Sequence, residues 1–202
     1  MNQNPKMRYP NSLVLAIIVV SLISSQCTAA QRESDGPVAE TDSRNVETQM
    51  VEFAKRGQYD EAIQLGLRSL KHNSADAFIY EQIAIIDIIR ARKDVDKRDS
   101  FVTEAVSYSN KALAINPTNE DVAGVHLFQI ARTFEAAGDL SKPEAACGYY
   151  EQATKLLENR APLLKGNSVV SKGKTTPLSP LRSENQRVLT GLSTKSKTVH
   201  CK

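Results

Sequence analysis

The side chains that most often perform catalysis or bind metals are scattered along this 202-residue sequence. The three histidines are His72, His126 and His200, and none lies at metal-ligand spacing from another His or from a Cys. The sequence also has no Gly-x-Ser-x-Gly motif, which is the turn that presents a nucleophilic serine in one class of hydrolase. It therefore predicts a protein that is not an enzyme, with no catalytic residue, no metal site and no cofactor.

Two further patterns resemble functional motifs but are better explained by local structure. Residues 173–175, Gly-Lys-Thr, match the end of a phosphate-binding loop. The first glycine of such a loop would stand at Ser168, and Pro177 would interrupt the helix that should follow. The adjacent carboxylates of Asp60 and Glu61 lie at the start of a helical pattern, where acidic residues are common.

The N-terminus has the pattern of a signal peptide over residues 1–30. Lys6 and Arg8 precede an apolar run over 13–23, and small residues follow it. We expect cleavage after Ala29 or Ala30, and a mature protein in the periplasm or secreted space.

Two alternatives would keep the N-terminus in the mature protein. Residues 9–29 could serve as an uncleaved membrane anchor, although the apolar run is shorter than the ~20 residues that usually span a bilayer. Cys27 could instead be lipidated, as in bacterial lipoproteins, but Gln26 directly before it departs from the small residue usual there.

Charge is distributed unevenly along the chain. Residues 31–159 contain 15 basic and 22 acidic side chains, whereas residues 160–202 contain 9 basic and 1 acidic. The basic tail has no Phe, Tyr or Trp to stack on bases, so we expect no nucleic-acid partner. It is expected to be solvated, or to contact an anionic lipid, a glycan or an acidic partner.

Cleavage would leave Cys147 and Cys201 in a compartment that allows disulfides. The sequence permits a bridge between them but equally permits a buried Cys147 and a free thiol near the C-terminus.

Small residues recur at a fixed spacing in three helical patterns. Ala62, Ala105 and Ala146 are each followed seven residues later by another small residue, namely Ser69, Ala112 and Ala153. Residues seven apart lie on one stripe of a helix, so a second helix can pack closely against each stripe. Gly57 and Gly138 precede two of the patterns and are typical of a helix end followed by a new helix.

These residues resemble the tetratricopeptide repeat, a unit of 34 residues that folds as helix–turn–helix. Residues 43–76 match one unit without gaps, with Gly57 and Tyr59 in the turn and Ser74 where Pro is usual. A second unit over 77–119 is longer because Ala62 and Ala105 are 43 residues apart. The extra residues fall around 90–100, in a charged loop or in lengthened helices, and a third unit covers about 120–159.

The resemblance implies an all-α fold, a short right-handed α-solenoid of about three repeats over residues 43–159. Residues 31–42 would be a linker. The helix expected at 77–92 is apolar almost all round, as in the middle of a stack. No segment shows period-two alternation, so we expect no sheet. Thr118 with Asp121, and Ser141 with Glu144, have the spacing of capping boxes.

Residues 160–202 form a low-complexity tail that should be mostly flexible. Within it, residues 181–193 have a short amphipathic pattern opened by Ser183 and Gln186. A stack of repeats needs a terminal helix over its last apolar face, so we expect 181–193 to be that cap. Residues 195–202 are polar and basic, and we expect them to be dispensable.

The resemblance also implies a concave face formed by the first helix of each repeat. The positions that would face a bound partner are Glu47, Val51, Phe78, Glu81, Gln82, Ile85, Ile89, Phe128, Gln129 and Arg132. Core packing is the competing explanation for Ile85 and Ile89, whereas it does not explain Glu81, Gln82 and Arg132. Some family members clamp a terminal carboxylate with Lys and Asn on this face. Those positions here hold other residues, so we do not expect that mode: Glu47, Val51, Gln82, Val125 and Gln129.

Two functions fit this organisation. The first is a protein–protein interaction scaffold or adaptor that binds a peptide or protein partner on the concave face. The second is a membrane-tethered structural component of an envelope assembly complex. The sequence does not identify the partner.

Overall fold

The computed structural model describes residues 38–117, 122–171 and 174–201, and residues from Ala39 onward belong to one compact unit. Most of the described chain is helical. The seven α-helices of the described part are α2 (Val38–Lys55), α3 (Tyr59–His72), α4 (Ala77–Lys93), α5 (Arg98–Ile115), α6 (Val125–Leu140), α7 (Pro143–Arg160) and α8 (Ser179–Thr198). Short 3-10 turns cover Val122–Gly124 and Ala161–Leu164.

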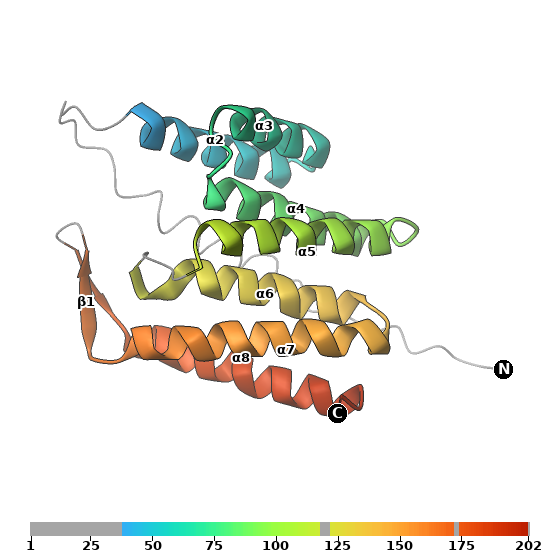
Figure 1. The fold of residues 1–202 in the computed structure, drawn as a ribbon, viewed down its shortest axis with the longest axis vertical. Helices are drawn as coiled ribbons and strands as arrows, with labels where there is room; N and C mark the ends of the chain where they lie inside the picture. The colour runs from blue at the N-terminus through green and yellow to red at the C-terminus, as the bar shows by residue number, and fades with distance from the viewer. Residues whose placement is uncertain (1–37, 118–121, 172–173, 202) are drawn as a thin grey trace. The chain divides into compact units, whose positions relative to one another are not determined.

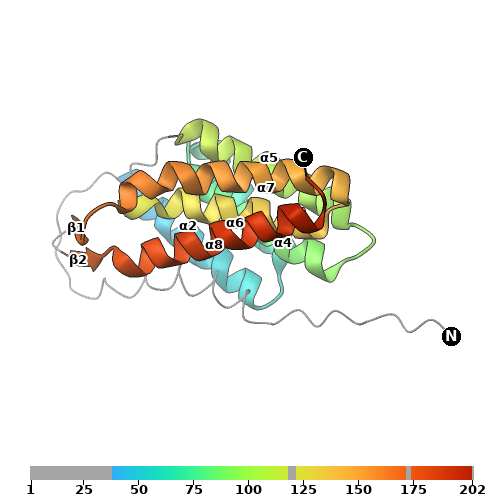
Figure 2. The same cartoon turned by 90° about the horizontal axis from the view of Figure 1, so that it is seen from below.

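The helices form three successive antiparallel pairs, α2 with α3, α4 with α5, and α6 with α7, followed by α8 (Figure 1). Figure 2 shows α5 and α7 on one side of the molecule and α2, α4 and α8 on the other. The expected all-α solenoid with a C-terminal capping helix is confirmed by this arrangement. The signal peptide expected over residues 1–30 and the first part of the linker lie outside the described residues.

The buried small residues allow the helices of each pair to pack closely. Ala62, Ala105 and Ala112 are fully buried, and so are Ala146 and Ala153 of the third pair. Large apolar side chains fill the space between pairs, and Ile79, Ile83 and Phe134 are among those with no exposed surface. The helix α4 is buried on several sides, as its sequence predicts.

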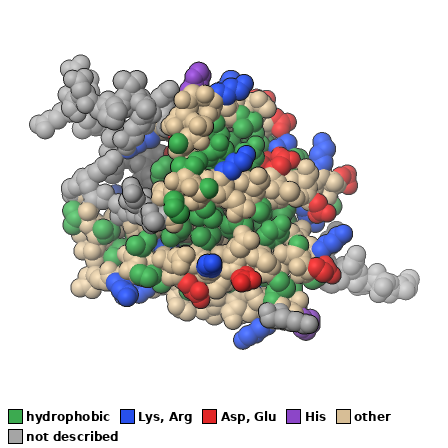
Figure 3. Space-filling view, in the orientation of Figure 1, with side chains coloured by type: hydrophobic (Ala, Val, Ile, Leu, Met, Phe, Trp, Pro, Cys, Tyr) green, Lys and Arg blue, Asp and Glu red, His purple; other side chains and the backbone are tan. Residues whose placement is uncertain are grey.

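Helix ends follow local signals in part. The Asp76 side chain accepts a hydrogen bond from the Ile79 N–H at 3.1 Å and so begins α4. Gly57 adopts φ +78° between α2 and α3, a left-handed conformation that favours glycine. Helices α4 and α5 run to 17 and 18 residues with a loop over 94–97, which accounts for the length of the second unit. Charged side chains gather at this end of the molecule, at the right of Figure 3.

Other local expectations are wrong. Ser141 does not cap α7, which begins after Lys142 without any side-chain cap, and Ser183 lies inside α8. Gly138 is a helical residue of α6 and does not end that helix. Thr118 and Asp121 lie outside the described residues.

The C-terminal tail is ordered where it is described, contrary to expectation. Strands β1 (Ser168–Ser171) and β2 (Lys174–Pro177) form an antiparallel hairpin in which Val169 is paired with Thr176. The four-residue strands are too short to produce a readable alternation in sequence. Helix α8 then packs on α7 through the buried side chains Val188 and Leu192, and Cys201 forms a disulfide with Cys147.

Candidate binding face on helices α4 and α6

The predicted binding residues lie on three helices of one layer, but they differ in exposure. Half-buried or exposed are Glu47 and Val51 of α2, Phe78 and Ile89 of α4, and Gln129 and Arg132 of α6. Buried are Glu81, Gln82 and Ile85 of α4 and Phe128 of α6. We call the accessible set of Phe78, Ile89, Arg92, Gln129 and Arg132 the α4/α6 face.

Glu81 is a core residue and not an exposed recognition residue. Its side chain is 1% exposed, and its carboxylate contacts Nδ1 of His126, which has no exposed surface. The Phe78 ring lies against the His126 ring in an edge-to-face arrangement, with the two ring centres 5.8 Å apart. A carboxylate buried this way needs a polar partner, and His126 of α6 supplies one. The pair therefore joins α4 to α6.

Gln82 has a similar role between α4 and α2. Its amide donates a hydrogen bond of 3.3 Å to the Glu47 carboxylate and is itself 4% exposed. Burial raises the pKa of Glu47, and Asp76 raises it further against the opposing effect of Arg44. Core packing thus accounts for both Glu81 and Gln82, which corrects their interpretation as the best recognition residues.

Phe128 is also removed from the accessible surface. The guanidinium of Arg160 lies 4.4 Å from the centre of its ring, and Arg160 is only 1% exposed. Arg160 also donates to the carbonyl of Ala123 at 3.0 Å and to the side chain of Asn185 in α8. Phe128 therefore belongs to the packing between α6, α7 and α8.

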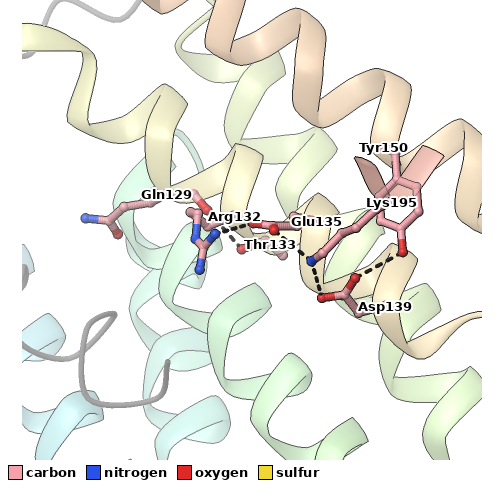
Figure 4. Close-up of polar contacts among 7 residues, drawn as sticks. All are labelled: Gln129, Arg132, Thr133, Glu135, Asp139, Tyr150 and Lys195. Carbon is pink, nitrogen blue, oxygen red and sulfur yellow. Dashed lines mark hydrogen bonds and ion pairs between the residues drawn. The ribbon is translucent and has the colours of Figure 1, made fainter. Parts of the chain in front are cut away.

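Arg132 keeps 12% of its side chain exposed and begins a row of polar contacts that runs to α8 (Figure 4). Its Nη1 donates to Oε2 of Glu135, and Lys195 donates to Oε1 of the same carboxylate at 2.8 Å. Lys195 also donates to Oδ2 of Asp139 at 2.7 Å, while the Tyr150 hydroxyl donates to Oδ1 at 3.0 Å. This row ties the capping helix to α6 through charge.

Arg92 lies one turn beyond Ile89 on α4, and the charges of α6 affect its pKa. Burial lowers the pKa of Arg92; Asp139 and Glu135 oppose that shift, and Arg132 adds to it. Among the described residues, Arg92 forms no ion pair or hydrogen bond through its side chain. An arginine keeps its charge under these conditions, so Arg92 presents a cation to the α4/α6 face.

Sequence reasoning missed Arg92, Glu135, Asp139 and Lys195. A signal for Arg92 was present, because Ile85, Ile89 and Arg92 follow the spacing of one helix face. No such signal existed for Lys195, which is separated by 60 residues from Glu135.

Other kinds of site are not found in the described part of the chain. No three or more His, Cys, Asp and Glu side chains there are grouped so that they could hold a metal ion. None of the described helices combines the length and the apolar character needed to cross a membrane.

No protein-family model matches the chain, and no curated protein sequence matches it. Among solved structures, it is similar to the Yersinia enterocolitica type III secretion translocator chaperone SycD, with 10% sequence identity. That likeness covers 78% of this chain and 99% of the SycD chain, with a TM-score of 0.47. Nothing about the function of this chain follows from a likeness at that level.

Proposed function

We propose that this chain is a non-catalytic scaffold or adaptor that binds a peptide or protein segment on its α4/α6 face. The observation that carries the proposal is the uneven covering of the helix layer. The side of α4 and α6 toward α5 and α7 is buried, while the other side leaves Phe78 45% exposed and, three turns farther along α4, Ile89 half-buried. Apolar rings and aliphatic chains next to charged groups are what recognition of a polypeptide requires.

A crosslinking experiment tests the location of binding. A photoreactive phenylalanine analogue at Phe78 should crosslink to a partner in extract of the native host, while the same analogue at Ser107 should not. Ser107 is exposed on α5, in the other layer, and serves as the matched control. Adding Ile89→Glu to the Phe78 probe should suppress the crosslink, because a carboxylate would replace apolar contact surface. Equal crosslinking from both positions would contradict the proposal.

We further propose that the protein is exported to the periplasm or secreted space. The Cys147–Cys201 disulfide supports this, because such bonds persist mainly in oxidising compartments. The charged, apolar and small-residue pattern of residues 1–30 supports it as well.

The intact mass of the natural protein distinguishes the exported form from the tethered alternative. Loss of residues 1–29 or 1–30 would support a soluble scaffold. A retained N-terminus or an acylated Cys27 would instead support a membrane-tethered component of an envelope assembly complex.

A further inference from the structure

The hairpin formed by β1 and β2 is held firmly at its base. Nε and Nη2 of Arg182 donate to the carbonyl of Leu164 at 3.2 and 2.9 Å, and Nη2 also donates to the carbonyl of Gly166. The N–H of Leu178 donates to the carbonyl of Asn167 at 3.0 Å, and the side chains of Leu164 and Leu178 are buried in one cluster. The hairpin therefore has a fixed place at one end of the helical stack (Figure 1 and Figure 2).

The two faces of the hairpin differ in exposure. Neighbouring residues in a strand point to opposite faces, so Val169 and Val170 lie on different sides. Val169 and its partner Thr176 are half-buried, and Val169 packs against the cluster at the base. Val170 and its partner Thr175 are exposed, and Val170 is 67% exposed, the highest value among the large apolar side chains of the described residues. The hairpin thus presents an apolar side chain outward.

The stretch of chain that contains the hairpin is basic. No Asp or Glu occurs between Glu158 and Glu184, whereas Lys165, Lys174 and Arg182 lie within that stretch. Both lysines are exposed. The hydrogen bonds of Arg182 described above go to neutral carbonyls, so they do not cancel its charge. An exposed apolar side chain with cations before and after it in the chain is the combination that favours attachment to an anionic lipid surface.

We propose that the β1–β2 hairpin is a contact site for an anionic membrane surface. Val170 enters the layer of lipid headgroups, while Lys165 and Lys174 lie beside their phosphates. A hairpin at the end of a stack can place one side chain between headgroups, whereas a stable contact with a protein buries a much larger surface. This contact goes beyond the proposed function, which concerns the α4/α6 face.

Cosedimentation with lipid vesicles tests the contact. The protein is residues 31–202, which contain the compact unit from Ala39 onward and lack the apolar run over 13–23 that could itself insert. One set of vesicles is phosphatidylcholine alone, and the other contains equal parts of phosphatidylcholine and phosphatidylglycerol. At about 0.15 M salt, the wild type should bind the anionic vesicles at least about tenfold more tightly, because each lysine near the surface adds to the attraction.

Val170→Asp should weaken binding to the anionic vesicles about fivefold or more, because it removes apolar contact and adds a negative charge. Val95→Asp is the matched control. Val95 is 65% exposed, close to the value for Val170, but it stands between Asp94 and Asp96 in the loop over 94–97. We expect Val95→Asp to change binding less than about twofold, because this loop does not face the lipid.

A second pair of variants tests the charges. Lys165→Gln combined with Lys174→Gln should weaken binding to the anionic vesicles about tenfold. Lys93→Gln combined with Lys97→Gln removes the same charge from exposed positions beside Val95 and is the matched control. It should weaken binding less than about threefold, because these positions contribute only to the overall charge of the protein.

Three results would overturn the proposal. Equal binding of the wild type to both kinds of vesicle would show that anionic lipid is not recognised. An unchanged Val170→Asp variant, or equal losses in Val170→Asp and Val95→Asp, would show that the hairpin is not the contact site. Equal losses in the two lysine pairs would reveal diffuse attraction by the whole protein. The lysine pairs alter only exposed side chains, so they decide the matter even if Val170→Asp does not fold.

Discussion

Asp87 is a buried carboxyl in the middle of the stack, on α4. It has no exposed surface, and only Oδ1 has a hydrogen-bond partner among the described residues, namely Arg90 at 3.0 Å. Arg90 is shared, because its other terminal nitrogen lies 3.0 Å from Asp60 and its guanidinium lies 3.9 Å from the centre of the Phe101 ring. Burial raises the pKa of Asp87 to about 7 against the opposing effect of Arg90.

The raised pKa predicts that Asp87 makes stability fall with rising pH. The folded pKa of about 7 lies above the unfolded value of 3.8, so between these values the folded state keeps a proton that the unfolded chain has released. The contribution of Asp87 is therefore most favourable at acidic pH, declines as pH rises through this window and levels off above about 7. Asp87→Asn should remove that dependence. The difference in free energy of unfolding between Asp87→Asn and the wild type should be about 1–3 kcal/mol more favourable to the variant at pH 8 than at pH 4.

Urea denaturation of both proteins at pH 4, 6 and 8 measures this effect. The difference in free energy of unfolding between Asp87→Asn and the wild type should grow steadily with pH. A difference that stays constant would mean that Asp87 is ionised in the folded protein throughout this range.

At the scale of the elements, α6 and α7 approach each other at Gly138. A Cβ atom placed there would lie 2.7 Å from Cδ1 of Tyr150 and closer still to Cε1 of the same ring. Tyr150 is buried and its hydroxyl is held by Asp139, so the ring cannot move without losing contacts. The glycine thus serves close packing between two helices.

Gly138→Ala should destabilise the protein by about 1–3 kcal/mol through overpacking. Gly148→Ala is the matched control, because Gly148 also lies in a helix but its added Cβ would meet nothing within 4 Å. That substitution should stabilise the protein by about 0.5–1 kcal/mol through helix propensity. Thermal and urea denaturation of the two variants compare these effects, and a stabilised Gly138→Ala variant would refute the close packing of Tyr150.

The disulfide joins α7 to the residues after α8, and its two cysteines are 54 positions apart in sequence. Such a crosslink restricts the unfolded chain, and for a loop of this length we expect Cys201→Ser to cost about 2–4 kcal/mol. Urea denaturation should show that Cys201→Ser matches the reduced wild type and unfolds earlier than the oxidised wild type. If all three unfold together, the two cysteines are not bridged.

For the whole molecule, α8 closes the end of the solenoid. Val188 and Leu192 are buried against α7, and Asn185 donates a hydrogen bond of 3.1 Å to the carbonyl of Leu157. Stacked repeats expose an apolar face wherever the stack ends, so the last pair of helices depends on this cover. The ion pairs of Lys195 and the disulfide of Cys201 argue against the expectation that residues 195–202 are dispensable.

Two truncations compared in reducing buffer should differ in a graded way. Removing 195–202 should lower the melting temperature modestly, because it deletes the ion pairs of Lys195 with Glu135 and Asp139. Removing 178–202 should lower it further and promote association, because it uncovers the apolar side of α7. Calorimetry and size-exclusion chromatography measure both effects. Equal melting temperatures and the same monomeric elution would show that α8 does not act as a cap.

The sequence by itself determined the helical architecture of this protein. Helix pairs follow from local rules: apolar residues repeat every 3.6 positions, small residues such as Ala105 and Ala112 recur seven apart, and Gly57 ends α2. These signals act over a few residues, so they can be read without knowing which helices meet. The need for a terminal cap follows in the same way from the open apolar face of a stack.

Only the tertiary structure decided which polar residues are accessible. Glu81 and Gln82 are residue types usually found at the surface, yet both are buried. Each pairs with a polar group on another helix, 45 residues away in sequence for Glu81 and 35 for Gln82. The pairings of Cys147 with Cys201 and of Lys195 with Glu135 could not be predicted either, because these residues are also far apart in sequence. Such contacts depend on how helices stack and not on local pattern, which is why the sequence alone could not predict them.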